Sequence, residues 1–291
     1  VFVTGGTGAI GTYAVKSLVA DGHSVTALAR SAEKAKLLTS WNATPISVSI
    51  FDRVALSAAL IGYDAVVNLA TAIPATSKFM QSSAWRENDR IRIEGSRALV
   101  DSAIAAKVPI LIQESVSMLY RDSGAKWVDE TFPLDSYPMA RGNLAAEANT
   151  QRFTASGRIG VALRFGWFYG PGATHSEQFL QLAKQHVCIM MGSPGSFVSS
   201  IHVADGGKAV AAALRAPAGA YNVTDNEPLT KLSYANALAS AANTKPWLRV
   251  PGVLALTLGN RTTSLTRSLR VSNALFRSTT GWEPEFPNAR I

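Results

Sequence analysis

The sequence predicts an α/β protein whose doubly wound parallel sheet is covered by helices on both faces and followed by a smaller, mixed C-terminal lobe. Short apolar runs alternate with amphipathic helical segments through residues 1–170, a pattern typical of a parallel sheet. The runs are apolar at consecutive positions, so both faces of each strand should be buried. After Gly170-Pro171-Gly172 the pattern loosens into shorter elements, which predicts the second lobe.

The expected elements follow one another in a regular order. The strands cover residues 1–4, 24–29, 45–50, 65–68, 108–112, 160–165 and 221–223. The helices cover residues 9–21, 31–38, 54–60, 85–106, 144–153, 177–185 and 204–215, with two or three more after position 231. In the first helix Ile10, Ala14 and Leu18 share one face, and Gly22 follows its end, as amphipathic periodicity and helix termination require.

Two interleaved regions are expected. Residues 1–170 form the larger domain, to which segments near 200–225 return, and residues 171–291 form a smaller lobe. The motifs described below predict that the larger domain binds a dinucleotide and that the smaller lobe binds a substrate. There is no internal repeat and no linker. The chain begins at Val1, already inside a strand, so we expect residues before it.

Composition excludes several classes of protein. Of 291 residues, 47% are hydrophobic and 16% are charged, which excludes a disordered chain. The net charge is +8, but the basic residues are scattered, so a nucleic-acid partner ranks last. The single cysteine, Cys188, and four histidines without ligand spacing predict neither a disulfide nor a metal site.

No segment predicts membrane insertion or secretion. No apolar run approaches the roughly 20 residues of a membrane span, and the first residues do not resemble a signal peptide. We therefore expect a cytoplasmic protein that has a small-molecule substrate and no membrane partner.

The most informative segment is the glycine-rich turn between the first strand and the first helix. Gly5 permits a tight turn, Gly8 lets backbone amides approach a pyrophosphate, and Gly11 lets the helix pack closely on the strand. The helix N-terminus stabilises the phosphate charge. The turn predicts a Rossmann-type dinucleotide site. The other residues expected to contact the cofactor there are Thr7, Ala9 and Ile10.

The end of the second strand indicates which dinucleotide is bound. An acidic residue here would bind the ribose hydroxyls of NAD, whereas this chain has Arg30, then Ser31 and, one turn later, Lys34. A guanidinium suits a 2′-phosphate and favours NADP, with NAD possible. The alternative is a solvated arginine at the start of a helix.

Further cofactor contacts follow the third and fourth strands. Asp52 is placed to meet the adenine amino group, or to cap the helix that begins near Val54, and the two roles are compatible. Leu69 and Ala70 end the fourth strand where backbone would line the cofactor crevice. That expectation rests on topology.

Several motifs follow one another along the whole chain. They are the glycine turn, Asp52, Val66 to Ala70, Arg164, Tyr169 to Gly172, His202 to Asp205, Tyr221 to Val223 and Gly281 to Pro284. In this order they resemble the extended short-chain dehydrogenase/reductase superfamily, and above all its atypical NAD-dependent epimerase/dehydratase-like members. The resemblance implies a Rossmann domain, a nicotinamide cofactor and a small C-terminal substrate lobe. The 85–106 helix and its successor commonly pair in a homodimer in this family, and the sequence leaves the oligomeric state of this chain open.

The resemblance also shows where this chain departs from the family. Its chemistry uses a Ser or Thr after the fifth strand, and a Tyr four residues before a Lys that holds the nicotinamide ribose. Counting back from the matching Glu147 places Asn143 at the lysine and Met139 at the tyrosine, and Val116 takes the Ser/Thr position. None of these three side chains supplies the expected proton-transfer chemistry.

Nearby residues could replace the missing groups. Ser115 and Ser117 flank Val116, and Tyr137 with Arg141 restores the Tyr-x-x-x-basic spacing, displaced by two residues. Two residues are about 200° around a helix, so Tyr137 faces the site only if the helix begins after it. Pro138 favours that start. The alternative is a surface tyrosine at a helix entry.

Glu114 is an unusual acid at the carboxyl edge of the sheet, beside the expected nicotinamide. It is either a general acid/base or a partner for Arg92 or Arg141. Trp167 and Tyr169, after the sixth strand, either wall a substrate pocket or belong to the core.

Two functions remain. The first is an NADP-binding oxidoreductase or epimerase/dehydratase-like enzyme that transfers hydride at a carbonyl or hydroxyl carbon. Loss of a positioned general acid costs about 10²–10⁴ in rate, so the second is a catalytically weak or inactive dinucleotide-binding redox sensor or scaffold. An apolar wall of Val116 and Met139 would favour the sensor.

Overall fold

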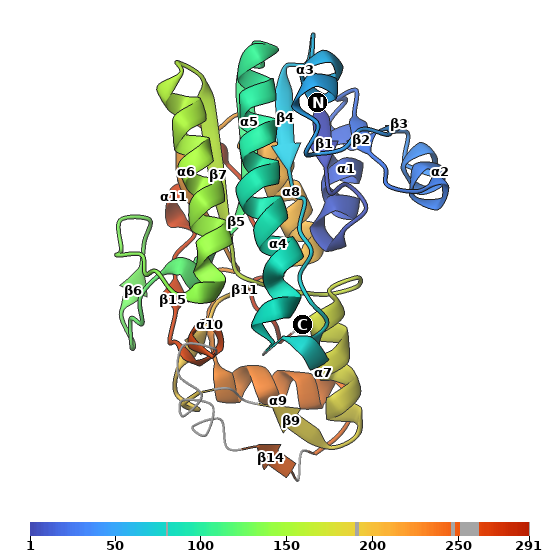
Figure 1. Ribbon diagram of the computed structural model, residues 1–291. Coiled ribbons are helices and arrows are strands. Elements are labelled where there is room, and N and C mark those ends of the chain that lie inside the picture. Colours follow the sequence, from blue (N-terminus) through green and yellow to red (C-terminus); the bar gives the residue numbers. More distant parts are fainter. Residues whose placement is uncertain (80, 190–191, 246–247, 251–261, 291) are drawn as a thin grey trace.

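A computed structural model describes residues 1–79, 81–189, 192–245, 248–250 and 262–290. Its centre is a seven-stranded sheet in the order β12-β7-β5-β4-β1-β2-β3, in which every neighbouring pair is parallel. This confirms the predicted fold class (Figure 1). The strands are β1 (Phe2–Thr4), β2 (Thr26–Leu28), β3 (Thr44–Ile46), β4 (Ala65–Asn68), β5 (Ile110–Val116), β7 (Ile159–Phe165) and β12 (Gly219–Val223).

Helices cover both faces of the sheet. On one face α1 packs against α8, and on the other α5 packs against α3 and α6. Consecutive strand residues point to opposite sides: Phe2 joins the core under α3 and α5, and Val3 the core under α1 and α8, which explains the uninterrupted apolar runs. The helices are α1 (Ala9–Ala20), α2 (Ala32–Ser40), α3 (Arg53–Ala59), α5 (Ser96–Ala105), α6 (Arg141–Ala155) and α8 (Val203–Ala213).

The second lobe lies at the carboxyl edge of the sheet, in the lower part of Figure 1. Its helices α7 and α9 pack together, while α11 returns to pack on β12. The helices here are α7 (Thr174–Lys184), α9 (Lys231–Ala241), α10 (Thr263–Thr266) and α11 (Ala274–Thr280). The paired short strands are β6 (Trp127–Val128) with β15 (Arg270–Val271), β8 (Trp167–Tyr169) with β11 (Ser200–His202), β9 (Val187–Ile189) with β14 (Leu248–Val250), and β10 (Phe197–Val198) with β13 (Leu229–Thr230).

Two elements differ from the prediction in ways that shape the site. Strand β5 continues to Val116 instead of ending at 112, because the polar side chains in its second half are buried with hydrogen-bond partners. The expected helix 85–106 is divided into α4 (Arg86–Arg90), a π-helical turn (Ile91–Gly95) and α5. Such π-turns are frequent at functional sites, and this one carries Arg92.

No helix in the described ranges is long and apolar enough to cross a membrane.

Candidate functional site

The glycine turn after β1 is closed against the end of β4. Gly5 has a φ of 73°, and a Cβ on it would lie 2.4 Å from the carbonyl oxygen of Leu69. A Cβ on Gly11 would lie 2.1 Å from the carbonyl oxygen of Gly5. No side chain other than hydrogen fits at either position without moving the backbone.

The same turn leaves an anion site at the start of α1. The N-cap residue is Gly8, which has no side chain to satisfy the first amides of the helix. Thr7 precedes it in the turn, and Ala9 and Ile10 open the helix. Unsatisfied amides at a helix N-terminus are the donors that phosphates use. The main chain therefore fits a dinucleotide pyrophosphate.

The predicted 2′-phosphate contacts lie together after β2. Arg30 is exposed, and Ser31 caps α2 by accepting a hydrogen bond from the amide of Lys34 at 3.3 Å. Neither cation forms an ion pair with another described residue. Beyond β3, Asp52 caps α3 by accepting from the amides of Val54 and Ala55 at 3.1 and 3.0 Å.

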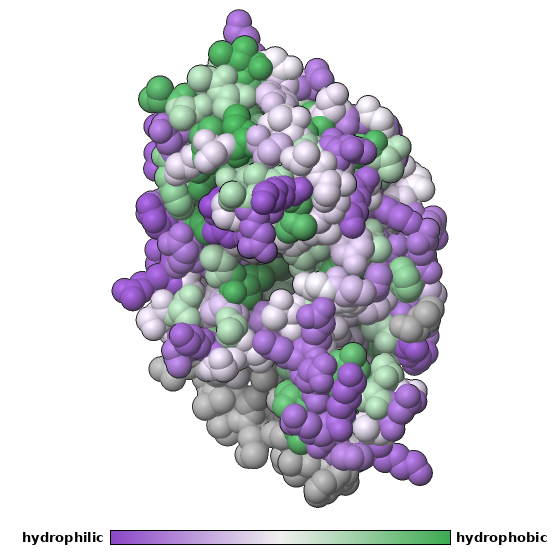
Figure 2. All heavy atoms as spheres, turned by 90° about the vertical axis from the view of Figure 1, so that its right-hand side faces the viewer, coloured by the Kyte–Doolittle hydropathy of each residue, from purple (hydrophilic) through white to green (hydrophobic). Residues whose placement is uncertain are grey.

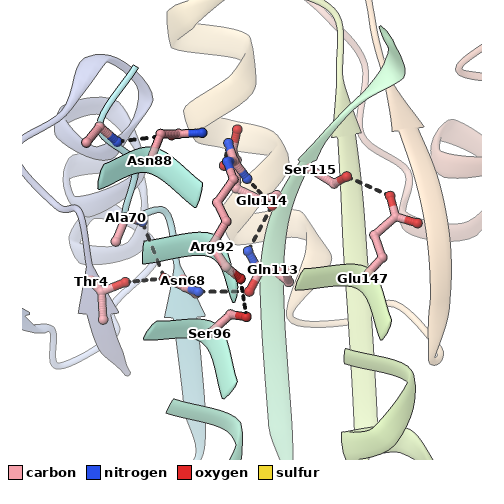
Figure 3. Close-up of polar contacts among 11 residues, drawn as sticks. Thr4, Asn68, Ala70, Asn88, Arg92, Ser96, Gln113, Glu114, Ser115 and Glu147 are labelled. Atoms are coloured by element: carbon pink, nitrogen blue, oxygen red, sulfur yellow. Dashed lines mark hydrogen bonds and ion pairs between the residues drawn. The ribbon is translucent and has the colours of Figure 1, made fainter. Parts of the chain in front are cut away.

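A buried polar network links the ends of β1, β4 and β5 (Figure 3). The hydroxyl of Thr4 donates to Asn68 Oδ1 at 2.6 Å, and Asn68 Nδ2 donates to Gln113 Oε1 at 2.8 Å. The amide of Ala70 also donates to Asn68 Oδ1, at 3.3 Å. The network holds the carboxyl edge of the sheet, where the crevice lies, in one arrangement.

Glu114 is paired with Arg92, one of the alternatives that the sequence left open. Arg92 Nη2 donates to the carboxylate at 2.7 Å, and both side chains are buried. Burial raises the pKa of Glu114, and the guanidinium acts in the opposite direction. Arg92 Nε is buried without a partner among the described residues.

Ser115 belongs to a second buried network, on the α6 side. Its hydroxyl donates to Glu147 at 2.6 Å, and Arg164 holds the same carboxylate with two donors, at 2.9 and 2.7 Å. Arg164 Nη1 also donates to the hydroxyl of Tyr120 at 2.8 Å. The hydroxyl of Ser115 is therefore engaged in joining β5, β7 and α6.

Tyr137 lies just before the helix, as Pro138 predicted. Its backbone is extended, a 3₁₀ turn covers Pro138–Ala140, and α6 follows. The phenol donates to the carbonyl oxygen of Met118 at 2.9 Å, and the guanidinium of Arg267 lies over its ring at 4.7 Å. Burial raises the pKa of Tyr137 to about 12.

The two positions to which the sequence count assigned the family's hydroxyl and tyrosine are occupied by apolar side chains. Val116 and Met139 pack in one cluster around buried Leu119, Tyr137 and Ala140. The third position, Asn143, is buried, and its Oδ1 has no hydrogen-bond partner in the described part of the chain. An acceptor of this kind fits a ribose hydroxyl of a dinucleotide.

A cavity separates the carboxyl edge of the sheet from the lobe, enclosing about 710 Å³ including its open mouth. Ser117 is the one among the four candidate catalytic residues that lines it. The described residues that line the cavity include Trp167, Phe179, Phe197, Lys231, Tyr234 and Arg267. The face of the molecule drawn in Figure 2 is hollowed near mid-height, with hydrophobic side chains inside the hollow.

Among these lining residues, the sequence predicted a functional role only for Trp167 and Ser117. Lys231 and Arg267 come from segments with weak periodicity, and nothing in their local sequence indicates a shared cavity. Three consecutive polar residues in an apolar strand, Gln113 to Ser115, were the available signal for the polar networks. No cluster of metal-ligating side chains occurs within the described ranges.

The fold and the site define a dinucleotide-binding Rossmann protein with a second lobe over the crevice. The chain belongs to the NAD dependent epimerase/dehydratase family, whose model matches residues 1–224. The family and the relatives that match over most of the chain indicate an NAD(P)-dependent function of the epimerase, dehydratase or reductase type.

Two relatives match over most of the chain. A 3-diazoavenalumate denitrifying reductase from a Streptomyces species is 31% identical over 303 residues, covering 100% of this chain and 97% of that protein. A 4-hydroxy-2-methyl-3-oxo-4-farnesyl-3,4-dihydroquinoline-1-oxide ketoreductase from Stigmatella aurantiaca is 27% identical, covering 84% of this chain and 73% of that protein.

Solved structures share the fold at low sequence identity. A human epimerase family protein with NADPH has a TM-score of 0.80 and 22% identity, covering 99% of this chain and 96% of that one. The UDP-glucose 4-epimerase of Thermus thermophilus in complex with NAD has a TM-score of 0.79 and 23% identity, with 99% and 95% covered.

Proposed function

We propose that the protein is an NADPH-dependent reductase that transfers hydride to a small substrate in the cavity, and that this transfer needs no proton from the family's tyrosine. The observation that carries the proposal is a glycine turn that fits a pyrophosphate together with a cavity that Ser117 lines at the edge of the sheet. The apolar cluster at Val116 and Met139 is the reason why the transfer cannot rely on the family's tyrosine. Arg30, Ser31 and Lys34 favour the 2′-phosphorylated dinucleotide.

The chain's own groups would hold the two reactants. The turn and the first amides of α1 would bind the pyrophosphate, and Leu69 and Ala70 would line the crevice beside it. Asn143 would accept a hydrogen bond from the nicotinamide ribose through its unpartnered Oδ1. When bound, the reduced dinucleotide supplies a hydride. Ser117 would donate a hydrogen bond to the substrate at the cavity wall.

The missing tyrosine restricts the substrate. Hydride addition to a carbonyl forms an alkoxide, which needs a proton from Ser117 or solvent. Replacement of dinitrogen at a diazonium carbon needs none: the new C–H bond takes the hydride's electron pair, the C–N bond breaks, and N₂ leaves. The name of the denitrifying reductase describes a reductive loss of nitrogen. We therefore place diazonium compounds ahead of ketones and aldehydes as substrates.

The other candidate catalytic groups would position this site. Tyr137 fixes the carbonyl of Met118, next to Ser117. Glu114 anchors Arg92, and Ser115 anchors Glu147. Tyr137→Phe and Glu114→Gln test whether either acts as a proton donor, because loss of a donor should lower the rate about 10²–10⁴-fold with aldehydes alone.

The second candidate function is a sensor that binds the dinucleotide without turnover. It is favoured by the same apolar cluster of Val116 and Met139, which removes the usual acid. A sensor would bind NADPH and reduce neither class of substrate.

Benzenediazonium and benzaldehyde, which share one ring, separate these functions. The loss of NADPH and the release of nitrogen gas are measured with each probe against a blank without protein. We expect reduction of the diazonium above the blank and a rate with the aldehyde that is lower by about 10²–10⁴. Faster reduction of the aldehyde would contradict the proton-independent mechanism, and NADPH binding without turnover of either probe would establish the sensor.

A further inference from the structure

The lobe side of the cavity contains a buried cation without a carboxylate partner. Lys231 begins α9, is 9% exposed and lines the cavity. Its Nζ donates to the carbonyl oxygen of Leu265 at 2.7 Å, and no carboxylate of the described residues forms an ion pair with it. Among the described residues this hydrogen bond occupies one of the three N–H donors of Lys231, and the other two can serve a ligand.

An anionic ligand would stabilise the charged, ammonium form of Lys231. Burial lowers the pKa of Lys231 to about 8, and attraction by Asp122 opposes that change. An ammonium that has lost hydration without gaining a counter-ion gains most from an anionic ligand.

The other cation in the wall, Arg267, is already neutralised. It forms an ion pair with Asp135 and donates to the carbonyl oxygen of Tyr120. Its guanidinium also lies over the ring of Tyr137. Among the described lining residues, the free positive charge is that of Lys231.

Four of the described lining residues are aromatic, among aliphatic and small polar side chains. The rings of Trp167 and Phe179 are stacked at 6.1 Å with an interplanar angle of 9°, and Phe197 and Tyr234 line the same space. Aromatic walls favour a planar ligand, which gains offset or edge contacts in addition to burial of its surface.

We propose that this cavity binds a planar aromatic monocarboxylate, with its carboxylate on Lys231 and its ring against the wall of Trp167, Phe179, Phe197 and Tyr234. The remote end of the molecule points toward Ser117 at the edge of the sheet. This inference rests on the proposed reductase function and names the chemical class of its substrate.

The same observations disfavour a nucleoside diphosphate as the occupant. A diphosphate carries at least two negative charges and is usually bound by several donors, often a bidentate arginine. Here the described lining offers one unpaired ammonium, and its arginine is occupied. The cavity suits one negative charge.

Three probes test the class on the unaltered protein. Cinnamate has the proposed ring and charge, cinnamamide has the same shape without the charge, and uridine diphosphate represents the rejected class. Binding is measured by calorimetry in the presence of NADPH. We expect cinnamate to bind at least about tenfold more tightly than cinnamamide and uridine diphosphate to be weaker than both. Equal binding of cinnamate and cinnamamide, absence of cinnamate binding, or preference for uridine diphosphate overturns the inference.

A variant pair assigns the charge to one residue. Lys231→Met should weaken cinnamate about tenfold or more and leave cinnamamide unchanged. The control is Lys208→Met, which removes an ammonium paired with Glu285 on the surface and should change neither affinity. If Lys231→Met does not fold, the comparison of the two probes on the unaltered protein still decides.

The failures of the two proposals can be told apart. Binding of NADPH without cinnamate overturns the aromatic carboxylate site and leaves the reductase intact. If the protein binds cinnamate but does not bind NADPH, the proposed reductase is overturned and the carboxylate site is retained.

Discussion

The two ends of the crevice are built from different parts of the chain. At the proposed cofactor end, the turn from Gly5 to Gly11 offers main-chain donors from one short segment. At the proposed substrate end, the cavity takes its side chains from β8, α7, β10, α9 and the segment near Arg267, which are far apart in sequence. A main-chain site depends on local spacing, whereas a side-chain site depends on how the whole fold brings segments together.

The first prediction concerns the buried polar network that supports the cavity wall at the substrate end. Arg164 holds Glu147 and Tyr120, and the carbonyl of Tyr120 holds Arg267 in the cavity wall. Arg164→Leu leaves the carboxylate of Glu147 buried and unpaired, so we expect the free energy of unfolding to fall by about 3–5 kcal/mol. Urea unfolding measures it.

The matched control is Arg152→Leu, which breaks the more exposed pair with Asp101. That change should cost less than about 1 kcal/mol. A loss of similar size in both variants would show that the buried network is not what supports this end of the crevice.

The second prediction concerns the main-chain end. Gly11→Ala places a Cβ 2.1 Å from the carbonyl oxygen of Gly5, so α1 must move away from the turn. We expect a destabilisation of about 1–3 kcal/mol together with loss of NADPH binding, measured by quenching of protein fluorescence. At Gly195 a Cβ meets nothing within 4 Å, and Gly195→Ala should bind NADPH normally. Normal binding by Gly11→Ala would refute the close-packing argument.

The contrast between the two ends also explains what could be predicted from the sequence. The glycine spacing, the strand that precedes it and the Ser31 and Asp52 caps are local, and local patterns are sufficient to identify them. The burial of Lys231 could not be predicted from local sequence, because Lys231 contacts the carbonyl oxygen of Leu265, 34 residues away.

Strand β5 shows a different limit of prediction from sequence. Its end was expected at residue 112, because polar residues usually end a buried strand. That expectation was wrong. Gln113, Glu114 and Ser115 stay in the strand only because Asn68, Arg92 and Glu147 come from other elements to pair with them. No single-sequence pattern contains those partners.

The third prediction tests the choice of dinucleotide at the cofactor end. Arg30→Asp replaces an exposed cation with the acid that binds ribose hydroxyls, so NADPH should weaken by about tenfold or more relative to NADH. The ratio of the two dissociation constants is the measurement. Lys36→Asp, on the same helix but after the first turn, makes the same change of charge and should shift the ratio less. An unchanged ratio for Arg30→Asp would remove the assignment of NADP.

The smallest expected effect is the pH dependence of cinnamate binding at the substrate end. The pKa of Lys231 lies at about 8 in the free protein, and a bound carboxylate raises it. The ammonium is present below that pKa and is lost as the pH rises through it, while cinnamate stays ionised throughout. The affinity for cinnamate should therefore fall about tenfold between pH 7 and pH 9. Cinnamamide serves as the control, since its affinity should stay level over this range. A flat profile for cinnamate, or one that rises with pH, would mean that the charge of Lys231 does not hold the ligand.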